Sequence, residues 1–163
     1  MALQNRTREA ILQGAKLEIA EVGSYESNMV DISTKAQVSR ATVYNHFADK
    51  EEMILALIES EIERLTQIAS GASSPKDALF LLSREISSDP ALAKMRTSDP
   101  VDIAKFVTES SSPLWQLALE SAMKIFGPTN GSLVIHWLIS QIGSPLSEGE
   151  SANQSEKLAR SFL

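Results

Sequence analysis

Apolar side chains recur along this chain at the spacing of an α-helix. Met29, Ile32 and Ala36 follow an i, i+3, i+7 pattern, and Val43 and Phe47 lie four residues apart, so each set shares one helix face. No stretch alternates apolar and polar residues as a half-buried strand does. The sequence therefore predicts an all-α protein, with helices over about residues 29–36, 39–47, 50–69, 75–87, 90–96, 100–110, 113–126, 129–142 and 149–162.

Signals for helix starts stand at the ends of these patterns. Ser39 precedes the second helix, and a serine hydroxyl accepts a hydrogen bond from a free N–H of the first turn. Asp49 followed by Glu52 matches a capping box, so another helix is predicted to begin there. All six prolines lie after residue 74, where each marks a helix start or a connection. Residues 29–52 thus predict two short helices joined by a tight turn, and the start of a third.

The second short helix divides its residues between a core and a polar surface. Val43 and Phe47 face inward, so Arg40, Ala41 and Asn45 point away from the core. A short helix of this kind can enter the major groove of DNA. Arg40 has the side chain that reads guanine, and Asn45 has the one that reads adenine. Ala41 and Thr42 offer contact to a thymine methyl group.

Phosphate contacts are predicted beside these base contacts. Tyr44, His46 and Lys50 are placed to meet the DNA backbone, which positions a protein without carrying sequence information. Lys50 also stands in the first turn of the next helix, where free N–H groups favour phosphate. The alternative is a plain three-helix unit with a solvated polar face. The predicted DNA-binding residues are Ser39, Arg40, Ala41, Thr42, Tyr44, Asn45, His46 and Lys50.

The segment resembles the helix-turn-helix of TetR (tetracycline-repressor) family regulators. Those proteins typically carry an isoleucine in the second helix, Ala-Gly-Val-Ser across the turn, a third helix ending Thr-Leu-Tyr-x-His-Phe, and a Lys-Glu pair opening the fourth. Residues 7–23 resemble the family's first helix and its closing glycine, and the resemblance covers about residues 6–65. The matching residues are Ile32, Ala36, Val38, Ser39, Arg40, Thr42, Val43, Tyr44, His46, Phe47, Lys50 and Glu51.

Two positions depart from the family's pattern. Gln37 stands where the turn usually has glycine, and a non-glycine residue with positive φ costs roughly 1 kcal/mol. Either the turn is reshaped or Gln37 accepts the strain. Val30 stands where family members often carry a polar residue, so the helix before the turn is expected to add little base readout.

Composition narrows the function classes. The chain of 163 residues has no cysteine, which excludes disulfides, thiolate catalysis and Cys-ligated zinc. It shows no apolar run of signal-peptide or membrane-spanning length, so a cytoplasmic protein with no membrane contact is expected. No metal site, cofactor or enzyme active site is predicted, since two S-x-x-K matches, at 73–76 and 121–124, lack any partner motif.

The charge is unevenly divided along the chain. The net charge is −6, yet residues 1–50 hold six basic and six acidic residues, and the whole acidic excess lies beyond them. A DNA-binding unit without net positive charge is expected to bind modestly as a monomer and with strong salt dependence. Two copies acting together are therefore predicted.

The chain divides into a DNA-binding domain, residues 1–50, and a second α-helical domain, residues 70–163, with the helix 50–69 connecting them. The resemblance implies that the second domain dimerises and can bind an effector. Aromatic residues and methionines often line apolar pockets, although each such residue also has a simpler place in the core. The predicted pocket residues are Phe80, Met95, Phe106, Trp115, Met123 and Phe126.

A dimer interface is predicted on the last two helices. The segment 133–142 is apolar almost all round, so it needs burial on more than one face. In the family, the last two long helices of each copy pair as a four-helix bundle. The alternative is that these helices form the core of one monomer. The predicted interface residues are Leu133, Val134, Trp137, Leu138, Ile142, Leu158 and Phe162.

Together these features predict a sequence-specific transcriptional regulator, a repressor that binds a palindromic site on double-stranded DNA as a homodimer. An effector, if the protein has one, is predicted to be small and apolar and to release the DNA. The competing hypothesis is an all-α dimeric module that binds a protein partner and no DNA. The acidic net charge and Val30 favour that hypothesis.

Overall fold

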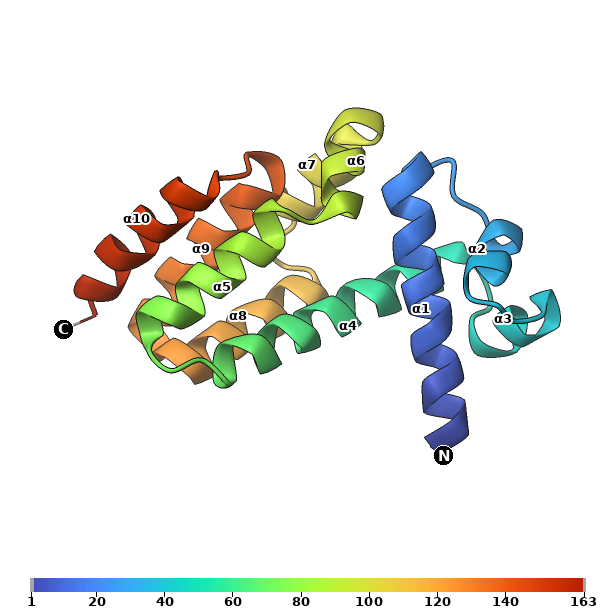
Figure 1. Ribbon diagram of the computed structural model, residues 1–163, viewed down its shortest axis with the longest axis horizontal. Helices are drawn as coiled ribbons and strands as arrows, with labels where there is room; N and C mark the ends of the chain where they lie inside the picture. The colour runs from blue at the N-terminus through green and yellow to red at the C-terminus, as the bar shows by residue number, and fades with distance from the viewer. Residues whose placement is uncertain (1, 163) are drawn as a thin grey trace.

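The computed structural model describes residues 2–162, with the side chains of residues 4–162, and is helical throughout (Figure 1). No strand occurs in this range, so the all-α prediction is confirmed. The helices are α1 (Ala2–Val22), α2 (Met29–Lys35), α3 (Arg40–His46), α4 (Lys50–Ser70), α5 (Pro75–Ser87), α6 (Pro90–Ser98), α7 (Pro100–Thr108), α8 (Pro113–Phe126), α9 (Pro128–Gly143) and α10 (Glu148–Arg160).

Proline and capping residues set where these helices begin. Five prolines open α5, α6, α7, α8 and α9, where the missing N–H removes no helical hydrogen bond. Ser39 and Asp49 cap α3 and α4 as predicted, accepting from the N–H groups of Thr42 (3.0 Å) and Glu52 (2.8 Å). The carboxylate of Glu52 accepts from Ala48 N–H (2.6 Å), one residue before the position that a capping box uses.

The first hydrophobic core holds together the predicted DNA-binding unit. Ile11 from α1, Ile32 from α2, Val43 from α3 and Met53 from α4 are fully buried in it. Ala91 from α6 belongs to the same core. In Figure 1, α1, α2 and α3 gather at one end of the molecule, and α4 runs from there along the second domain. The packing of the DNA-binding unit therefore extends beyond residue 50, into the first turns of α4 and one face of α6.

The second core lies among α5, α8, α9, α10 and the far half of α4. Helices α8 and α9 cross closely at Gly131, where a Cβ atom would lie 2.4 Å from Cα of Met123. A buried polar network joins α5, α9 and α10: the Ser83 hydroxyl donates to Gln141 Oε1 (2.7 Å) and lies 2.8 Å from the Ser151 hydroxyl. Because these contacts link helices distant in sequence, they hold the second domain in one arrangement.

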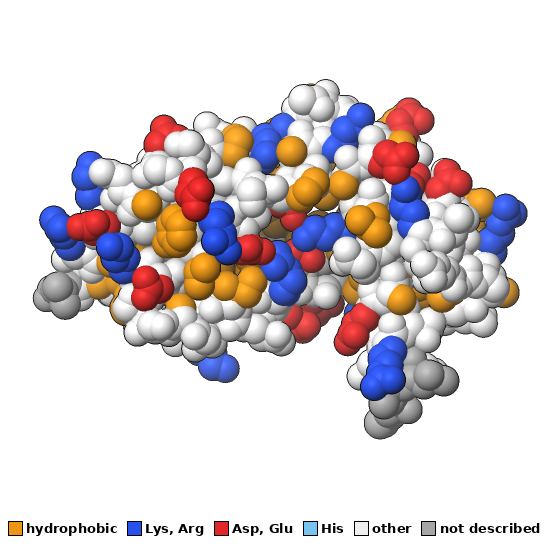
Figure 2. Space-filling view, viewed as in Figure 1, with side chains coloured by type: hydrophobic (Ala, Val, Ile, Leu, Met, Phe, Trp, Pro, Cys, Tyr) orange, Lys and Arg blue, Asp and Glu red, His pale blue; other side chains and the backbone are white. Residues whose placement is uncertain are grey.

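Ion pairs tie the two domains together across a hollow. The Lys16 ammonium of α1 lies 2.8 Å from Glu61 of α4 and 2.8 Å from Asp89, the residue that caps α6. Arg64 of α4 bridges Glu61 (3.0 Å) and Glu85 of α5 (2.8 Å). Figure 2 shows charged side chains of both signs in this hollow. The DNA-binding unit is thus anchored to the second domain by charge as well as by its shared core.

Candidate nucleic-acid interface and effector cavity

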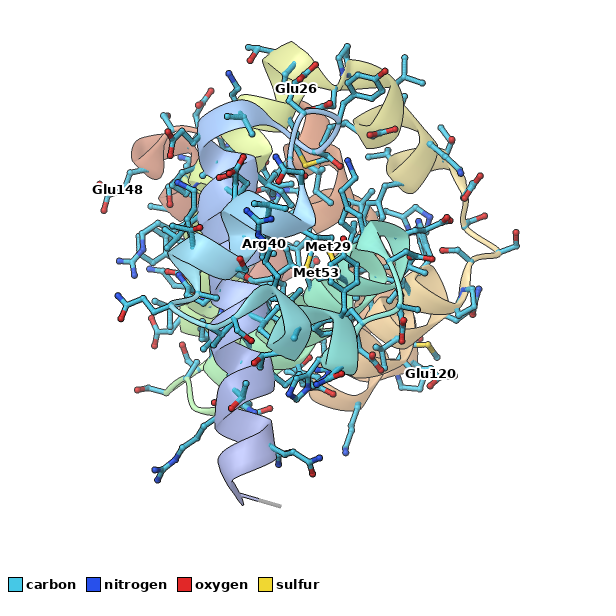
Figure 3. The ribbon with its side chains drawn as sticks, turned by 90° about the vertical axis from the view of Figure 1, so that its right-hand side faces the viewer. Glu26, Met29, Arg40, Met53, Glu120 and Glu148 are labelled. Atoms are coloured by element: carbon cyan, nitrogen blue, oxygen red, sulfur yellow. The ribbon has the colours of Figure 1, made fainter. Side chains whose placement is uncertain are left out.

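Helix α3 presents one polar face to solvent and buries the other. Val43 and Phe47 are 0% and 2% exposed and hold the helix against the first core. Arg40, Ala41 and Asn45 are exposed on the opposite side. Figure 3, which views the end of the molecule that carries α2 and α3, shows Arg40 on the near surface with Met29 and Met53 in the core. The predicted division of α3 is therefore confirmed.

The remaining side chains of α3 differ in solvent exposure and in the contacts they make. Tyr44 is 54% exposed and open to solvent. His46 is half-buried, with its ring 6.3 Å from the ring of Phe47. The hydroxyls of Ser39 and Thr42 lie 2.8 Å apart and bond each other. Ser39 therefore stabilises the start of α3 as its N-cap. The hydroxyl of Thr42 is already hydrogen-bonded, so its methyl group is the part of that side chain suited to contact with a thymine.

The turn between α2 and α3 contains a strained residue. Gln37 has φ of 56°, the left-handed region that favours glycine. Three backbone hydrogen bonds close the turn, including Val38 N–H to Ser33 O at 3.0 Å. Gly14 of α1 packs on it so tightly that a Cβ atom there would lie 2.8 Å from the nitrogen of Ala36. Of the two alternatives for Gln37, strain rather than a reshaped turn is what the structure contains.

Lys50 does not face solvent as a phosphate-binding residue would. Its ammonium donates to the backbone carbonyls of Ser24 (3.0 Å), Tyr25 (2.9 Å) and Ser27 (2.9 Å). An ammonium group has three donors, so these contacts use all of them. The structure corrects the predicted phosphate role: Lys50 binds the loop between α1 and α2 instead.

The same loop is held from the other side by Asp99, at the junction of α6 and α7. The Asp99 carboxylate accepts from the N–H groups of Ser24 (3.0 Å) and Tyr25 (3.0 Å) and from the Ser98 hydroxyl (2.5 Å). Gly23 lies against this junction, and a Cβ atom on it would come within 2.4 Å of Asp99 Oδ2. We call this arrangement the loop clamp: Lys50 and Asp99 grip residues 23–27 from the two domains.

Hydrogen bonds keep Asp99 ionised despite its burial. Burial would raise the pKa of its carboxyl, but the Ser98 hydroxyl, the Tyr25 and Ser24 amides and the Lys50 charge together hold that pKa below the ordinary value. The carboxylate form is therefore the one that grips the loop. The sequence does not predict the clamp, because Lys50 lies 23 to 26 positions and Asp99 lies 74 or 75 positions from the loop residues that they bind.

The six cations of the predicted DNA-binding unit differ in whether they are paired. Lys16 and Lys50 are engaged as described, and Lys35 pairs with Glu21 (2.5 Å) and Glu18 (3.4 Å). Within residues 4–162, Arg6, Arg8 and Arg40 form no ion pair. The Arg8 guanidinium lies 5.4 Å from the centre of the Phe47 ring, which places it beside the end of α3.

An apolar cavity of about 100 Å³ lies in the second domain, between α4, α5, α7, α8 and α9. Of the six predicted pocket residues, Phe106, Trp115 and Phe126 line it. Phe80, Met95 and Met123 do not. Phe80 lies under the Arg84 guanidinium (5.9 Å), and Met95 packs on the first core.

The cavity wall that the sequence did not predict comes from α4. Ile62, Leu65 and Ala69 line it, at the i, i+3, i+7 spacing of one helix face. This spacing was visible in the sequence, but it does not indicate which second helix the face meets. The indole N–H of Trp115 is buried with no hydrogen-bond partner in the described part of the chain. Such a group typically costs about 1–3 kcal/mol.

The predicted dimer residues fall into three groups. Val134 and Leu138 are buried inside one monomer, so the alternative of a monomer core is correct for them. Trp137, Ile142, Leu158 and Phe162 are half-buried against the same core, and Trp137 donates its N–H to Gln154 (2.8 Å). Leu133 is 51% exposed. The apolar surface of α9 is buried mostly by its own chain, because α8, α5 and α7 all pack on it.

The described residues contain neither a candidate metal site nor a helix that could span a membrane. Histidine, aspartate and glutamate side chains form no group of three or more that could hold a metal ion there. No helix within residues 2–162 is both long enough and apolar enough to cross a membrane.

Comparison with known proteins bears on the interface. Residues 11–57 match the family model for bacterial regulatory proteins of the tetR family. The chain is 31% identical over 173 aligned positions to the HTH-type transcriptional regulator YxbF of Bacillus subtilis, covering 97% of this chain and 44% of that protein. It is 27% identical over 115 positions to the HTH-type transcriptional repressor AcnR of Corynebacterium glutamicum, covering 64% of this chain and 58% of AcnR. The chain thus spans about half the length of these two relatives.

Solved structures agree on the fold. The crystal structure of the TetR family repressor AlkX from a Dietzia strain superposes with a TM-score of 0.68 at 18% identity, over 95% of this chain and 94% of AlkX. The fatty acid degradation regulator FadR from Bacillus halodurans superposes with a TM-score of 0.63 at 15% identity, over 96% and 94% of the two chains. At such identities the likeness concerns the fold alone.

Proposed function

Because the chain belongs to the TetR family of bacterial transcriptional regulators, we propose that it represses transcription by binding a palindromic operator as a homodimer. The single observation that carries this proposal is the exposed face of α3. Its side chains are of the types that read bases, and a capped, buried opposite face holds them in place. Two such helices bound to successive major grooves would lie roughly 34–36 Å apart.

Direct readout of bases is assigned to Arg40 and Asn45, with Ala41 and the Thr42 methyl group contacting thymine. Tyr44 and His46 are assigned to the backbone, together with Arg6 and Arg8 of α1 in place of Lys50. The Arg8 contact with Phe47 supports this assignment, because it holds a cation beside the recognition helix. Since few cations are available per copy, binding by two copies is needed for useful affinity.

The test of base readout is Arg40→Ala. If Arg40 contacts guanine through two hydrogen bonds, the variant should lose roughly 1–3 kcal/mol of operator binding and become indifferent to the base at that position. The measurement is an electrophoretic shift with the gene's own upstream DNA and with single-base variants of it. Lys157→Ala, an exposed residue of α10, is the matched control and should bind as wild type. Unchanged base preference in Arg40→Ala would refute the assignment.

The test of dimerisation is Leu133→Glu. Leu133 is 51% exposed on α9, so the change should alter monomer stability by no more than about 0.5 kcal/mol. A charge buried in a dimer interface is costly, so the variant should sediment at half the mass of wild type. Leu55→Glu, on α4, starts from the same exposure of 50% and should leave the mass unchanged. A Leu133→Glu protein that sediments like wild type would place the interface elsewhere.

Control by a small apolar effector is proposed through α7. Phe106 of α7 lines the cavity, and Asp99 at the start of α7 grips the loop between α1 and α2. A ligand that moves α7 would therefore move the loop that leads into the helix-turn-helix. Such a ligand shifts the equilibrium only if it binds one of the two arrangements more tightly.

A further inference from the structure

Three helices meet at the ammonium group of Lys16. It lies 2.8 Å from Oε2 of Glu61, on α4, and 2.8 Å from Oδ2 of Asp89, the residue that caps α6. The three side chains are 19%, 27% and 11% exposed, so salt screens these pairs less than pairs on an open surface. Lys16 belongs to α1, and both of its partners lie beyond residue 50. The contact therefore ties the DNA-binding unit to the rest of the chain at one point.

Apolar packing between the same helices fixes their orientation less closely. Helix α1 packs on both α4 and α6, and Ala91 and Met95 of α6 contact the first core (Figure 1). The hydrophobic effect is non-directional and follows buried area, so a small rotation of α1 costs little of it. Hydrogen bonds weaken steeply as distance and angle change. An ammonium that must reach two carboxylates on different helices therefore allows a narrower range of orientations.

The loop clamp supplies a second fixed point on the same helix. It grips residues 23–27, directly after α1 ends at Val22. Lys16 lies about two turns earlier, roughly 10 Å back along the helix axis. A helix held at one end can pivot, whereas a helix held at two points keeps its direction. Asp89 and Asp99 flank α6, so both points hold α1 to the same neighbouring helix.

Loss of the Lys16 charge would leave its partners repelling each other. Both carboxylates lie within hydrogen-bond distance of the same nitrogen, so their oxygens are close neighbours. Without that cation, the hollow is lined by the carboxylates of Glu61, Glu85 and Asp89 and by one guanidinium, that of Arg64. Like charges at this separation repel. Helices α4 and α6 would then no longer hold α1 at its second point.

We infer that Lys16 is a positioning residue that sets the half-site spacing accepted by the dimer on DNA. The direction of α1 determines where α3 is presented, because both helices share the first core. One base pair more or less between the half-sites moves them by about 3.4 Å and turns them by roughly a tenth of a turn. A dimer whose α1 helices are fixed can therefore match one spacing only. This inference rests on the proposed function, since half-site spacing has a meaning only for a dimer on a palindrome.

The experiment measures binding to duplexes that differ only in half-site spacing. Footprinting on the gene's own upstream DNA locates the palindrome, and base pairs are then inserted or removed at its centre. Electrophoretic shift gives the affinity for each duplex. Wild type should bind the native spacing about tenfold or more tightly than a spacing changed by one base pair. In Lys16→Met this ratio should fall to about threefold or less.

Lys35→Met is the matched control. Lys35 also belongs to the DNA-binding unit and also pairs with two carboxylates, but these are Glu18 and Glu21 of α1, inside the unit. The variant loses the same charge from the same unit, so its preference for the native spacing should stay at the wild-type ratio. Lys16→Arg keeps a cation at the junction of the three helices and should also keep that ratio.

Asp89→Asn breaks the contact from the other side. Asparagine is as good an N-cap as aspartate, so α6 keeps the cap on the N–H of Leu92. The variant should lose spacing preference as Lys16→Met does, although it makes the protein more positive where Lys16→Met makes it more negative. An effect that the two variants share therefore does not come from total charge. Thermal unfolding of each variant identifies a temperature at which all are folded, and binding is compared there.

The outcomes separate this inference from the proposed function. An unchanged ratio in Lys16→Met, or an equal loss in Lys35→Met, would overturn the inference. A wild type that binds its palindrome but accepts every spacing equally would overturn it as well, and would leave the proposed function intact. A wild type that shifts none of the duplexes would refute the proposed function, and the inference with it.

Discussion

Asp99→Ala is expected to lower the free energy of unfolding by about 3–4 kcal/mol, because it leaves the amides of Ser24 and Tyr25 without their acceptor. For a chain of this length, the melting temperature should fall by about 10 °C. Calorimetry or circular dichroism measures both. The matched control is Asp102→Ala, an exposed carboxylate three residues further along α7, which should change the melting temperature little.

The same substitution should weaken DNA binding, because the loop that leads into α2 loses its anchor in the second domain. Operator affinity at a temperature where the variant is fully folded measures this effect apart from stability. If Asp99→Ala melts like wild type, the two amides are satisfied in another way and the clamp has no energetic role.

Acid provides an independent test of Asp99. Its pKa is lower folded than unfolded, so its contribution to stability is fully present above the unfolded value of about 3.8 and is lost as pH falls through the folded value. Asp99→Asn cannot titrate. The stability difference between wild type and Asp99→Asn should therefore be constant above about pH 5 and shrink below about pH 4. Urea unfolding at pH 6, 4.5 and 3.5 measures it; a difference that does not shrink would contradict the ionised clamp.

Lys50→Met is expected to lower the free energy of unfolding by about 2–3 kcal/mol and to reduce DNA binding as a consequence. Methionine keeps the apolar stem but leaves the carbonyls of Ser24, Tyr25 and Ser27 without their donor. Water can reach part of this site, so the loss is smaller than three charged hydrogen bonds would suggest.

Salt dependence separates this role from a phosphate contact. If Lys50 acts through the loop, the slope of log affinity against log salt should be the same in Lys50→Met as in wild type. A phosphate contact would lower the slope by about one and leave stability unchanged. Arg6→Gln is the matched comparison, since Arg6 is exposed near the start of α1, and it should show the lower slope with wild-type stability. A lower slope with wild-type stability in Lys50→Met, and an unchanged slope in Arg6→Gln, would show that Lys50 contacts phosphate.

The helix-turn-helix could be predicted because its signals are local. Ser39 and Asp49 cap their helices through residues three positions away, and Val43 with Phe47 places the inner face of α3. These relations depend on helix geometry alone, which any sequence carries in its spacing. The strain at Gln37 could also be anticipated, although only the structure decides between strain and a different turn.

Some residues that were predicted for the dimer interface or the pocket lie in the cores of the monomer, and the reason is the same for both sets. An apolar residue indicates that its side chain is buried, but it does not indicate which part of the protein buries it. Val134 and Leu138 are covered by their own chain, whereas Leu133, next to them in sequence, is exposed. Likewise Phe106 and Trp115 line the cavity, while Met95, equally apolar, packs on the first core.

The sequence alone was enough to predict the helices, their caps and the exposed face of α3, since these follow from contacts within a few residues. Only the tertiary structure decided what Lys50 and Asp99 do. Lys50 stands in a helix start that favours phosphate, yet folding places three carbonyls of a loop some 25 residues earlier around its ammonium. Asp99 meets the same loop from 75 residues away. Charged groups form hydrogen bonds with the partners that folding brings to them. Here the partners are set by the packing of α6 on α1 and not by any local pattern.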